Sequence, residues 1–230
     1  MRTQVKKFQG LTLFDTLAQK GLANLFERLA KKGIRNRRLL RALEVIPRSM
    51  FVDYSWVKFI YDNMVLPIDC GEYIEKIEEQ LKIIDALDVN KTHHILEVGT
   101  GSGFSGAILA YLSGRVTTIE RYKGLCEHAK RNYAALSLKN IVVKHSDGQR
   151  FLSGIGHYDR IIVWPALPSI SQDYMQLLKE NGLFIAPVEE EISQKVQSIM
   201  LYEKRDSTFE GKKLFSVRYQ PIAKNIAAAL

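Results

Sequence analysis

The stretch that decides the fold is Ile95-Leu96-Glu97-Val98-Gly99-Thr100-Gly101-Ser102-Gly103-Phe104-Ser105-Gly106. A short apolar run enters a glycine-rich turn, and the turn opens a segment with helical spacing of its apolar residues. Glycine permits a tight turn and lets a ligand lie against the main chain, while the N-terminus of the next helix presents free N–H donors. The stretch therefore predicts a strand, a ligand-binding loop and a helix in that order.

Short apolar runs alternate with amphipathic patterns after this point. The runs predict strands at residues 95–98, 116–119, 141–143, 160–163 and 183–187. The segments between them predict helices at residues 104–112, 123–136 and 171–180. This order is typical of an α/β fold whose helices cover both faces of a parallel sheet. Beyond Pro187, residues 197–203 and 215–220 predict antiparallel strands joined by a turn at 206–213. We expect a Rossmann-like sheet, mostly parallel, with an antiparallel C-terminal finish.

A helical cap is expected before the sheet. Its helices are predicted at residues 12–31, 36–45 and 75–87. Turn residues make 46–75 irregular, and no repeat or flexible linker divides the chain. We therefore expect one domain over residues 1–230, with a helical cap in residues 1–90 and the ligand-binding sheet in residues 91–230.

The composition is that of a globular chain with excess positive charge. Of 230 residues, 46% are hydrophobic, and the net charge is +8. The chain has no run of about 18 apolar residues and no secretory signal pattern, so we expect a cytoplasmic protein that does not associate with a membrane. Cys70 and Cys126 lack ligand spacing, which predicts free thiols and no metal site. The basic stretch 31–41 has no interleaved aromatic residue, which favours a solvated helix face over a specific nucleic-acid site.

Acidic residues accompany the ends of three successive predicted strands. Glu97 lies in the second half of its apolar run, Glu120 ends the next run, and Asp147 with Gly148 follows the third. Ligands of open parallel sheets bind at the carboxyl ends of the strands. We therefore expect these residues to meet in one site.

The choice of ligand lies between a dinucleotide and S-adenosylmethionine. Gly101-x-Gly103-x-x-Gly106 satisfies the dinucleotide fingerprint. However, the Glu97 carboxylate would repel a pyrophosphate. Because burial of a carboxylate without a partner is costly, Glu97 suits a methionine ammonium group, directly or through water. The sequence therefore favours S-adenosylmethionine.

The remaining acidic residues fit the nucleoside part of that cofactor. Glu120 can accept hydrogen bonds from both ribose hydroxyls, as acidic residues also do in NAD sites, and Asp147 can accept one from the adenine amino group. The predicted cofactor-binding residues are Glu97, Gly99, Thr100, Gly101, Ser102, Gly103, Glu120, Arg121, Asp147 and Gly148.

Motifs outside the glycine loop resemble the protein-L-isoaspartate O-methyltransferase family. The segment Pro47-Arg48-Ser49-Met50-Phe51-Val52 is similar to the family's Pro-Arg-x-x-Phe-Val, and 61–68 to its aromatic-x-Asp…Leu-Pro-Ile. Val217-Arg218-Tyr219-Gln220-Pro221-Ile222 is similar to Val-Arg-Phe-x-Pro-Leu. The resemblance covers residues 37–224. It implies a class I methyltransferase that methylates a carboxylate of isoaspartyl residues in damaged proteins, with Asp62 as a candidate catalytic residue.

The acceptor side departs from the family pattern. Glu72-Tyr73-Ile74-Glu75-Lys76-Ile77 stands where the family has Gln-Thr-Ile-Ser-x-Pro, in which a hydroxyl helps to hold the acceptor. After the fourth predicted strand, Val163-Trp164-Pro165-Ala166 replaces a small Ala-Ala stretch. The resemblance implies that the acceptor contacts Ile74, Trp164, Pro165 and Ala166, and that Glu75 takes a catalytic position.

Glu75 has two interpretations. An ionised carboxylate about 4 Å from the acceptor carboxylate would repel it by up to roughly 4 kcal/mol at an effective dielectric near 20. This predicts poor isoaspartyl activity and a gain on Glu75→Ser, larger if Tyr73→Thr is added. In the other interpretation Glu75 is a solvent-exposed acid in the first turn of a helix, stabilised by the helix dipole. A diverged enzyme with another acceptor, or a protein that binds the cofactor without isoaspartyl activity, remains an alternative.

Overall fold

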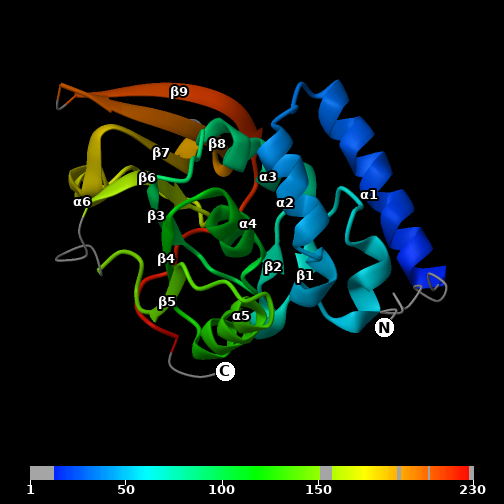
Figure 1. The fold of residues 1–230 in the computed structure, drawn as a ribbon. Coiled ribbons are helices and arrows are strands. Elements are labelled where there is room, and N and C mark those ends of the chain that lie inside the picture. Colours follow the sequence, from blue (N-terminus) through cyan, green and yellow to red (C-terminus); the bar gives the residue numbers. More distant parts are fainter. Residues whose placement is uncertain (1–12, 151–156, 191–192, 207, 228–230) are drawn as a thin grey trace, which may run out of the picture.

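The computed structural model describes residues 13–150, 157–190, 193–206 and 208–227. Its centre is a seven-stranded sheet with the order β5-β4-β3-β6-β7-β8-β9 (Figure 1). The strands are β3 (His94–Val98), β4 (Arg115–Glu120), β5 (Ile141–His145), β6 (Tyr158–Val163), β7 (Leu178–Glu190), β8 (Ser193–Arg205) and β9 (Thr208–Val217). Strands β3 to β7 pair in parallel, whereas β8 and β9 are antiparallel. The predicted mostly parallel sheet with an antiparallel finish is confirmed.

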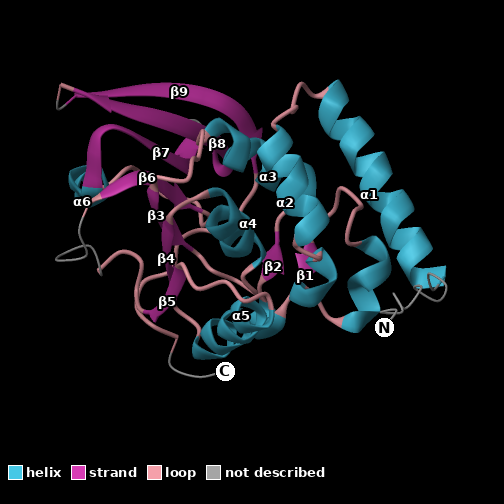
Figure 2. Ribbon diagram, in the orientation of Figure 1, coloured by secondary structure: helices cyan, strands magenta, loops and turns pink. Residues whose placement is uncertain are grey.

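Helices pack around the sheet, and the N-terminal helices lie to one side of it (Figure 2). They are α1 (Leu13–Lys31), α2 (Arg37–Val45), α3 (Ile77–Ala86), α4 (Phe104–Leu112), α5 (Lys123–Ala135) and α6 (Gln172–Leu177). The first two lie together beside the sheet, and α2 packs against α4 (Figure 1). Within the described ranges no helix is long and apolar enough to cross a membrane. A secretory signal would fall in residues 1–12, outside the described residues.

The segment between α2 and α3 contains short ordered elements. These are η1 (Arg48–Phe51), η2 (Tyr54–Phe59), β1 (Leu66–Pro67), η3 (Asp69–Gly71) and β2 (Tyr73–Ile74). The antiparallel pair β1–β2 ends at Ile74, and α3 begins at Ile77 rather than at residue 75 as predicted. Glu75 is therefore not in a helical turn.

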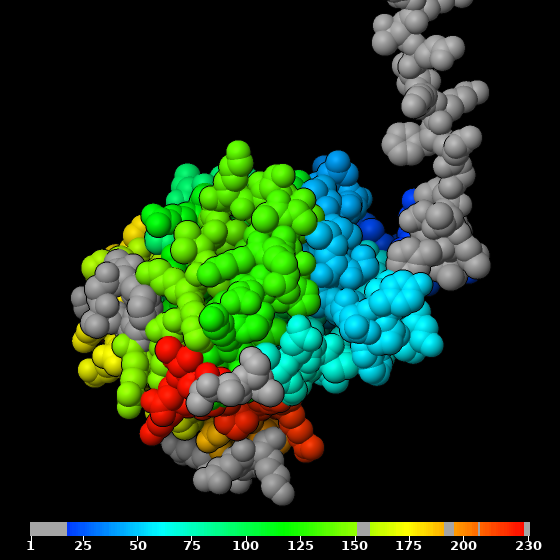
Figure 3. Space-filling view, turned by 90° about the horizontal axis from the view of Figure 1, so that it is seen from below, coloured from blue at the N-terminus to red at the C-terminus, as the bar shows by residue number. Residues whose placement is uncertain are grey.

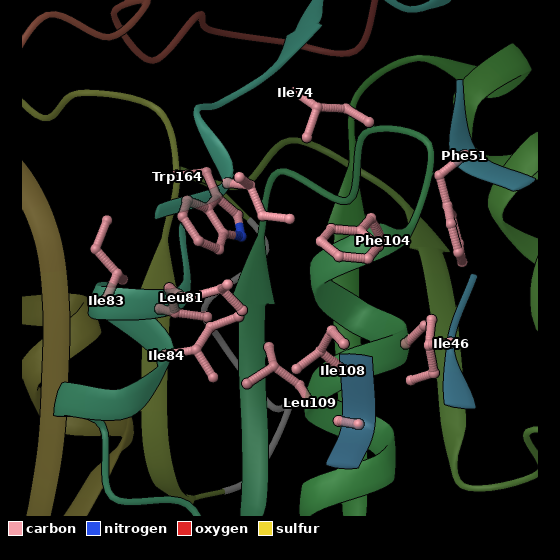
Figure 4. Close-up of a cluster of buried hydrophobic side chains, with 14 of the residues drawn as sticks. Ile46, Phe51, Ile74, Leu81, Ile83, Ile84, Phe104, Ile108, Leu109 and Trp164 are labelled. Carbon is pink, nitrogen blue, oxygen red and sulfur yellow. The ribbon is translucent and has the colours of Figure 1, made fainter. Parts of the chain in front are cut away.

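The two faces of the sheet have separate apolar cores, because successive side chains of a strand point to opposite faces. Ile95 of β3 belongs to a core with α3, α4 and α5, whereas Leu96 and Val98 belong to a core with α6. Ile74, Phe104 and Trp164 lie near one end of the first core (Figure 4). The predicted alternation of strands and covering helices is thus realised as two packed layers on one sheet.

Two predicted boundaries in the C-terminal third are wrong. Helix α6 ends at Leu177, because the buried Leu178 pairs with Tyr158 as the first residue of β7 and Asn181 has a φ of 59°. Most of the predicted turn 206–213 belongs to β9. Gly211 pairs there with Tyr202, and a Cβ at Gly211 would lie 2.6 Å from its ring. Glycine is required at this position because Tyr202 packs closely against it across the hairpin, not because the chain turns there.

Candidate active site

A pocket of about 920 Å³, open to solvent, lies at the carboxyl ends of strands β3, β4, β5 and β6. Four separate parts of the chain form its wall: the glycine loop, the strand ends, the segment around Glu75 and the C-terminal residues 220–223. Of the residues predicted for the site, those that line it are Ile74, Glu75, Gly99, Thr100, Gly101, Ser102, Glu120, Arg121, Gly148, Trp164 and Pro165.

The glycine loop brings the main chain to the pocket surface. Gly101 has a φ of 55°, in the left-handed region that favours glycine, and a Cβ there would lie 3.4 Å from the Ile68 side chain, which also lines the pocket. The loop is tied to β4, since the Gly101 N–H donates to Glu120 at 2.9 Å and the hydroxyls of Thr100 and Thr118 are 2.6 Å apart. Any side chain at position 101 would therefore occupy space in the pocket wall.

Glu120 is fixed in the wall by backbone donors. Its Oε2 accepts from Gly101, and its Oε1 accepts from the N–H groups of Arg121 at 2.8 Å and Tyr122 at 3.0 Å. Burial raises the pKa of Glu120, and these three donors act in the opposite direction. A carboxylate offers about four acceptor positions, so one remains for a ligand hydroxyl.

Glu97 lies behind the wall. Its side chain is fully buried and accepts hydrogen bonds from Ser105 at 2.6 Å, Thr118 at 2.8 Å and the indole N–H of Trp164 at 3.0 Å. Burial raises its pKa, and the three donors lower it. The predicted contact with a methionine ammonium group stays a prediction. In the structure, Glu97 holds Trp164, which lines the pocket.

Two buried polar atoms of pocket-lining residues indicate a polar ligand. Ser102 Oγ and Gln80 Oε1 have no hydrogen-bond partner within the described part of the chain. Buried polar groups in proteins nearly always have partners. Together with the glycine loop and Glu120, these atoms fit the amino-acid and nucleoside groups of S-adenosylmethionine. No cluster of His, Cys, Asp or Glu in the described ranges could hold a metal ion.

The protein-L-isoaspartate(D-aspartate) O-methyltransferase family model matches residues 20–227. The chain belongs to this family. The protein-L-isoaspartate O-methyltransferase of Azorhizobium caulinodans is 34% identical over 88% of this chain and 92% of its own. That of Yersinia enterocolitica is 35% identical over 90% and 98%.

Solved structures agree with this membership. A protein-L-isoaspartate O-methyltransferase structure has a TM-score of 0.78 at 25% identity, covering 89% of this chain and 67% of the other. A Plasmodium falciparum protein, described as a beta-aspartate methyltransferase in complex with S-adenosyl-L-homocysteine, has a TM-score of 0.72 at 22% identity over 88% and 98% of the two chains. The latter likeness shows a shared fold.

Glu75 lies in the pocket wall. It is partly buried, and its Oε2 accepts a hydrogen bond from Gln80 at 3.1 Å. Its main-chain carbonyl accepts one from the buried Arg48 at 3.0 Å. Burial raises the pKa of Glu75 to about 7, against the effects of its own backbone N–H and of Arg48. The interpretation of Glu75 as a solvent-exposed acid in a first helical turn is therefore wrong.

Two residues predicted to contact ligands form hydrogen bonds with the C-terminal segment in the structure. The Asp147 carboxylate accepts from the N–H groups of Gln149 at 2.8 Å and Asn225 at 2.7 Å, and it does not line the pocket. Ala166 is fully buried and exchanges backbone hydrogen bonds with Gln220 and Ile222. Their predicted contacts with adenine and acceptor stay predictions, and in the structure both residues position residues 220–225 beside the pocket.

Two further predicted residues lie outside the pocket wall. Asp62 is exposed in the turn after η2 and does not line the pocket, and its catalytic role stays a prediction. Gly103 is the N-cap of α4, and a Cβ there would lie 2.9 Å from the Tyr133 hydroxyl. Its small size allows Tyr133 to pack closely, and its contact with the cofactor stays a prediction.

The sequence did not identify several pocket residues. Among them are Ile68, Glu72, Gln80, Tyr122 and the segment 220–223. The available signal was Gln220-Pro221-Ile222, the end of a motif that indicated only the family resemblance. The C-terminal segment lies at the surface of the molecule (Figure 3). The Gln220 N–H donates a hydrogen bond to the Tyr73 hydroxyl at 3.0 Å.

Proposed function

We propose that this protein methylates a carboxylate of isoaspartyl residues in damaged proteins, with S-adenosylmethionine as cofactor. The cofactor is that of the family. The observation that carries the proposal is a single pocket in which the glycine loop and Glu120 face Ile74, Glu75 and Trp164. The names of the relatives supply the substrate class. We propose a role in protein repair in the cytoplasm.

The cofactor side is proposed to bind through main-chain and carboxylate groups. The loop from Gly99 to Ser102 would hold the amino-acid part of the cofactor, and Glu120 would accept one ribose hydroxyl. Arg121 and Gly148 complete this side of the wall. When bound, S-adenosylmethionine supplies a methyl group on a positively charged sulfur.

The acceptor side needs no strong base. An acceptor carboxylate is ionised at neutral pH, since its pKa is about 4. The residues of this side therefore bind and orient it, and orientation alone can account for several powers of ten in rate. Trp164, fixed by Glu97, and Pro165 form an apolar part of the wall that excludes water from the reacting groups.

Methyl transfer from labelled S-adenosylmethionine to an isoaspartyl peptide tests the proposal, with the aspartyl peptide of the same sequence as control. We expect label in the isoaspartyl peptide alone, as a base-labile ester. Equal labelling of both peptides, or of neither while S-adenosylhomocysteine still stabilises the protein, would contradict it. The second result would favour the alternative of another acceptor.

A further inference from the structure

We propose that Glu75 selects the acceptor as a neutral carboxylic acid, which donates a hydrogen bond to the acceptor carboxylate and repels it once the proton is lost. The inference rests on the proposed function, because it concerns the same acceptor. It makes Glu75 a specificity-determining residue whose protonation switches isoaspartyl methylation on and off.

The position of Glu75 gives it access to the acceptor. It follows β2 and precedes α3, and it lines the pocket together with Trp164 and Pro165. The amide of Gln80 donates to one carboxyl oxygen, so the group is held at the wall. Gln80 is itself 2% exposed, which leaves this pair little freedom to turn toward bulk water.

Arg48 acts to lower the pKa of Glu75 through its charge but does not pair directly with the Glu75 carboxylate. Arg48 of η1 is 1% exposed, and its guanidinium donates to the main-chain carbonyls of Ile60 at 2.6 Å and Glu75 at 3.0 Å. No ion pair joins Arg48 to a carboxylate in the part of the chain that the structure describes. A partly buried carboxyl group without a direct cation favours its neutral form.

The other titratable groups around Glu75 add negative charge or none. Glu97 of β3 and Glu79 of α3 oppose its ionisation, whereas Tyr73 of β2 and Tyr219 after β9 are neutral at physiological pH. The charge of Glu79 is partly balanced by Lys76 at 3.2 Å. The burial that raises the pKa of Glu75 to about 7 is therefore reinforced by both carboxylates.

The proton determines the sign of the interaction with the acceptor. A protonated carboxyl group has one O–H donor, and a hydrogen bond to an ionised acceptor is among the strong ones. The proton stays on Glu75 throughout. The acceptor oxygen forms the new bond to the methyl carbon, and the electron pair of the broken carbon–sulfur bond remains on sulfur. The acceptor must itself be ionised, so activity is confined between its pKa of about 4 and that of Glu75.

The experiment is the pH profile of kcat/KM for methyl transfer to an isoaspartyl peptide between pH 5.5 and 9, at saturating S-adenosylmethionine. We compare the native protein with Glu75→Gln, which keeps the shape and a permanent donor, and with Glu75→Ser as a second neutral variant. Glu79→Gln is the matched control, because it removes a neighbouring carboxylate that does not line the pocket.

The native rate is expected to fall by about tenfold per pH unit above pH 7, whereas both position-75 variants stay flat. In the Glu79→Gln control the rate still falls with pH, but the fall begins at slightly lower pH because Glu79 no longer raises the pKa of Glu75. A flat native profile between pH 6 and 9, or the same falling limb in Glu75→Gln, overturns the inference and leaves the proposed function standing. No methyl transfer by any form at any pH overturns the proposed function and this inference with it.

Discussion

The proposed cofactor side and the proposed acceptor side of the pocket differ in the groups that form them. On the cofactor side, main-chain N–H groups of Gly101, Arg121 and Tyr122 hold Glu120 in place. On the acceptor side, the wall depends on side chains, with Gln80 bonded to Glu75 and Glu97 bonded to Trp164. Main-chain N–H groups are present whatever the side chains are, whereas the side-chain bonds of the other wall are lost when one of those residues is replaced. The two sides can therefore diverge separately.

The largest effect is expected where the main chain itself meets the cofactor. Gly101→Val adds a branched side chain at a φ of 55° and fills space beside Ile68. S-adenosylhomocysteine at about 100 times its Kd should stabilise the native protein by about 2.7 kcal/mol, which raises Tm by roughly 5–10 °C for a chain of this size. The variant should show no shift.

The matched control for this prediction is Gly33→Val. Gly33 has a φ of 82° and no heavy atom within 4 Å of an added Cβ, so the backbone strain is similar and the pocket is untouched. This control should keep the full shift with S-adenosylhomocysteine. A full shift in Gly101→Val, or a shift with NAD in the native protein, would show that the loop does not bind this cofactor.

A medium effect is expected for the hydrogen bond that holds Trp164 in the wall of the proposed acceptor side. Trp164→Phe removes the indole N–H from the buried Glu97, and an unsatisfied buried acceptor costs about 1–3 kcal/mol. Thermal unfolding should show a Tm lower by about 2–10 °C. Trp56→Phe is the control, since Trp56 is partly buried, packs on Phe59 and does not line the pocket. Equal losses in both variants would mean that the bond to Glu97 adds nothing.

A smaller effect links Glu75 to stability. Its pKa rises from 4.5 to about 7 on folding, so its protonation stabilises the folded state fully below pH 4.5, and this stabilisation is lost as the pH rises through 7. Between pH 6 and 8.5 the native protein should lose about 1.4 kcal/mol of unfolding free energy from this group. Urea unfolding of Glu75→Gln should lack this loss, whereas Glu79→Gln should retain it. The same pH dependence in all three forms would place the Glu75 carboxylate in bulk water.

The smallest effect is expected in the basic stretch 31–41. Arg38 is structural, because it donates to the carbonyls of Val89 and Leu112. Arg35 and Arg37 are exposed and far from the pocket-lining residues in sequence. Replacing both with Ala should leave methyl transfer within about twofold, and any nucleic-acid binding should be weak and steeply salt-dependent. Submicromolar binding to one sequence at physiological salt, lost in the double variant, would contradict this.

The sequence predicted those features that depend on local patterns. The alternation of strands and helices follows from apolar periodicity, and the glycine loop follows from residues such as Gly101, whose backbone conformation depends on its own identity. Features that depend on distant pairs were not predictable. Nothing near Glu97 signals that its partner is Trp164, and nothing near Asp147 signals its bond to the Asn225 N–H.

Boundaries failed for a related reason. Leu178 continues a helical pattern but joins β7, because tertiary burial and pairing with Tyr158 override its local preference. Likewise, Gly211 is a turn residue by composition and a strand residue by its contact with Tyr202. In both cases the residue that determines the structure, Tyr158 or Tyr202, is too far away in sequence to affect a local pattern.

The separation of the two sides is tested most directly by the rate ratio of Glu75→Ser to native protein on an isoaspartyl peptide, measured at pH 6 and at pH 8.5. The Kd of S-adenosylhomocysteine is measured alongside for both forms. The ratio should be within about twofold of one at pH 6 and above about tenfold at pH 8.5, since half of a 4 kcal/mol repulsion already slows the reaction more than tenfold. The Kd should be the same in both forms. Equal ratios at the two pH values, or a Kd that changes with the residue at position 75, would contradict the account.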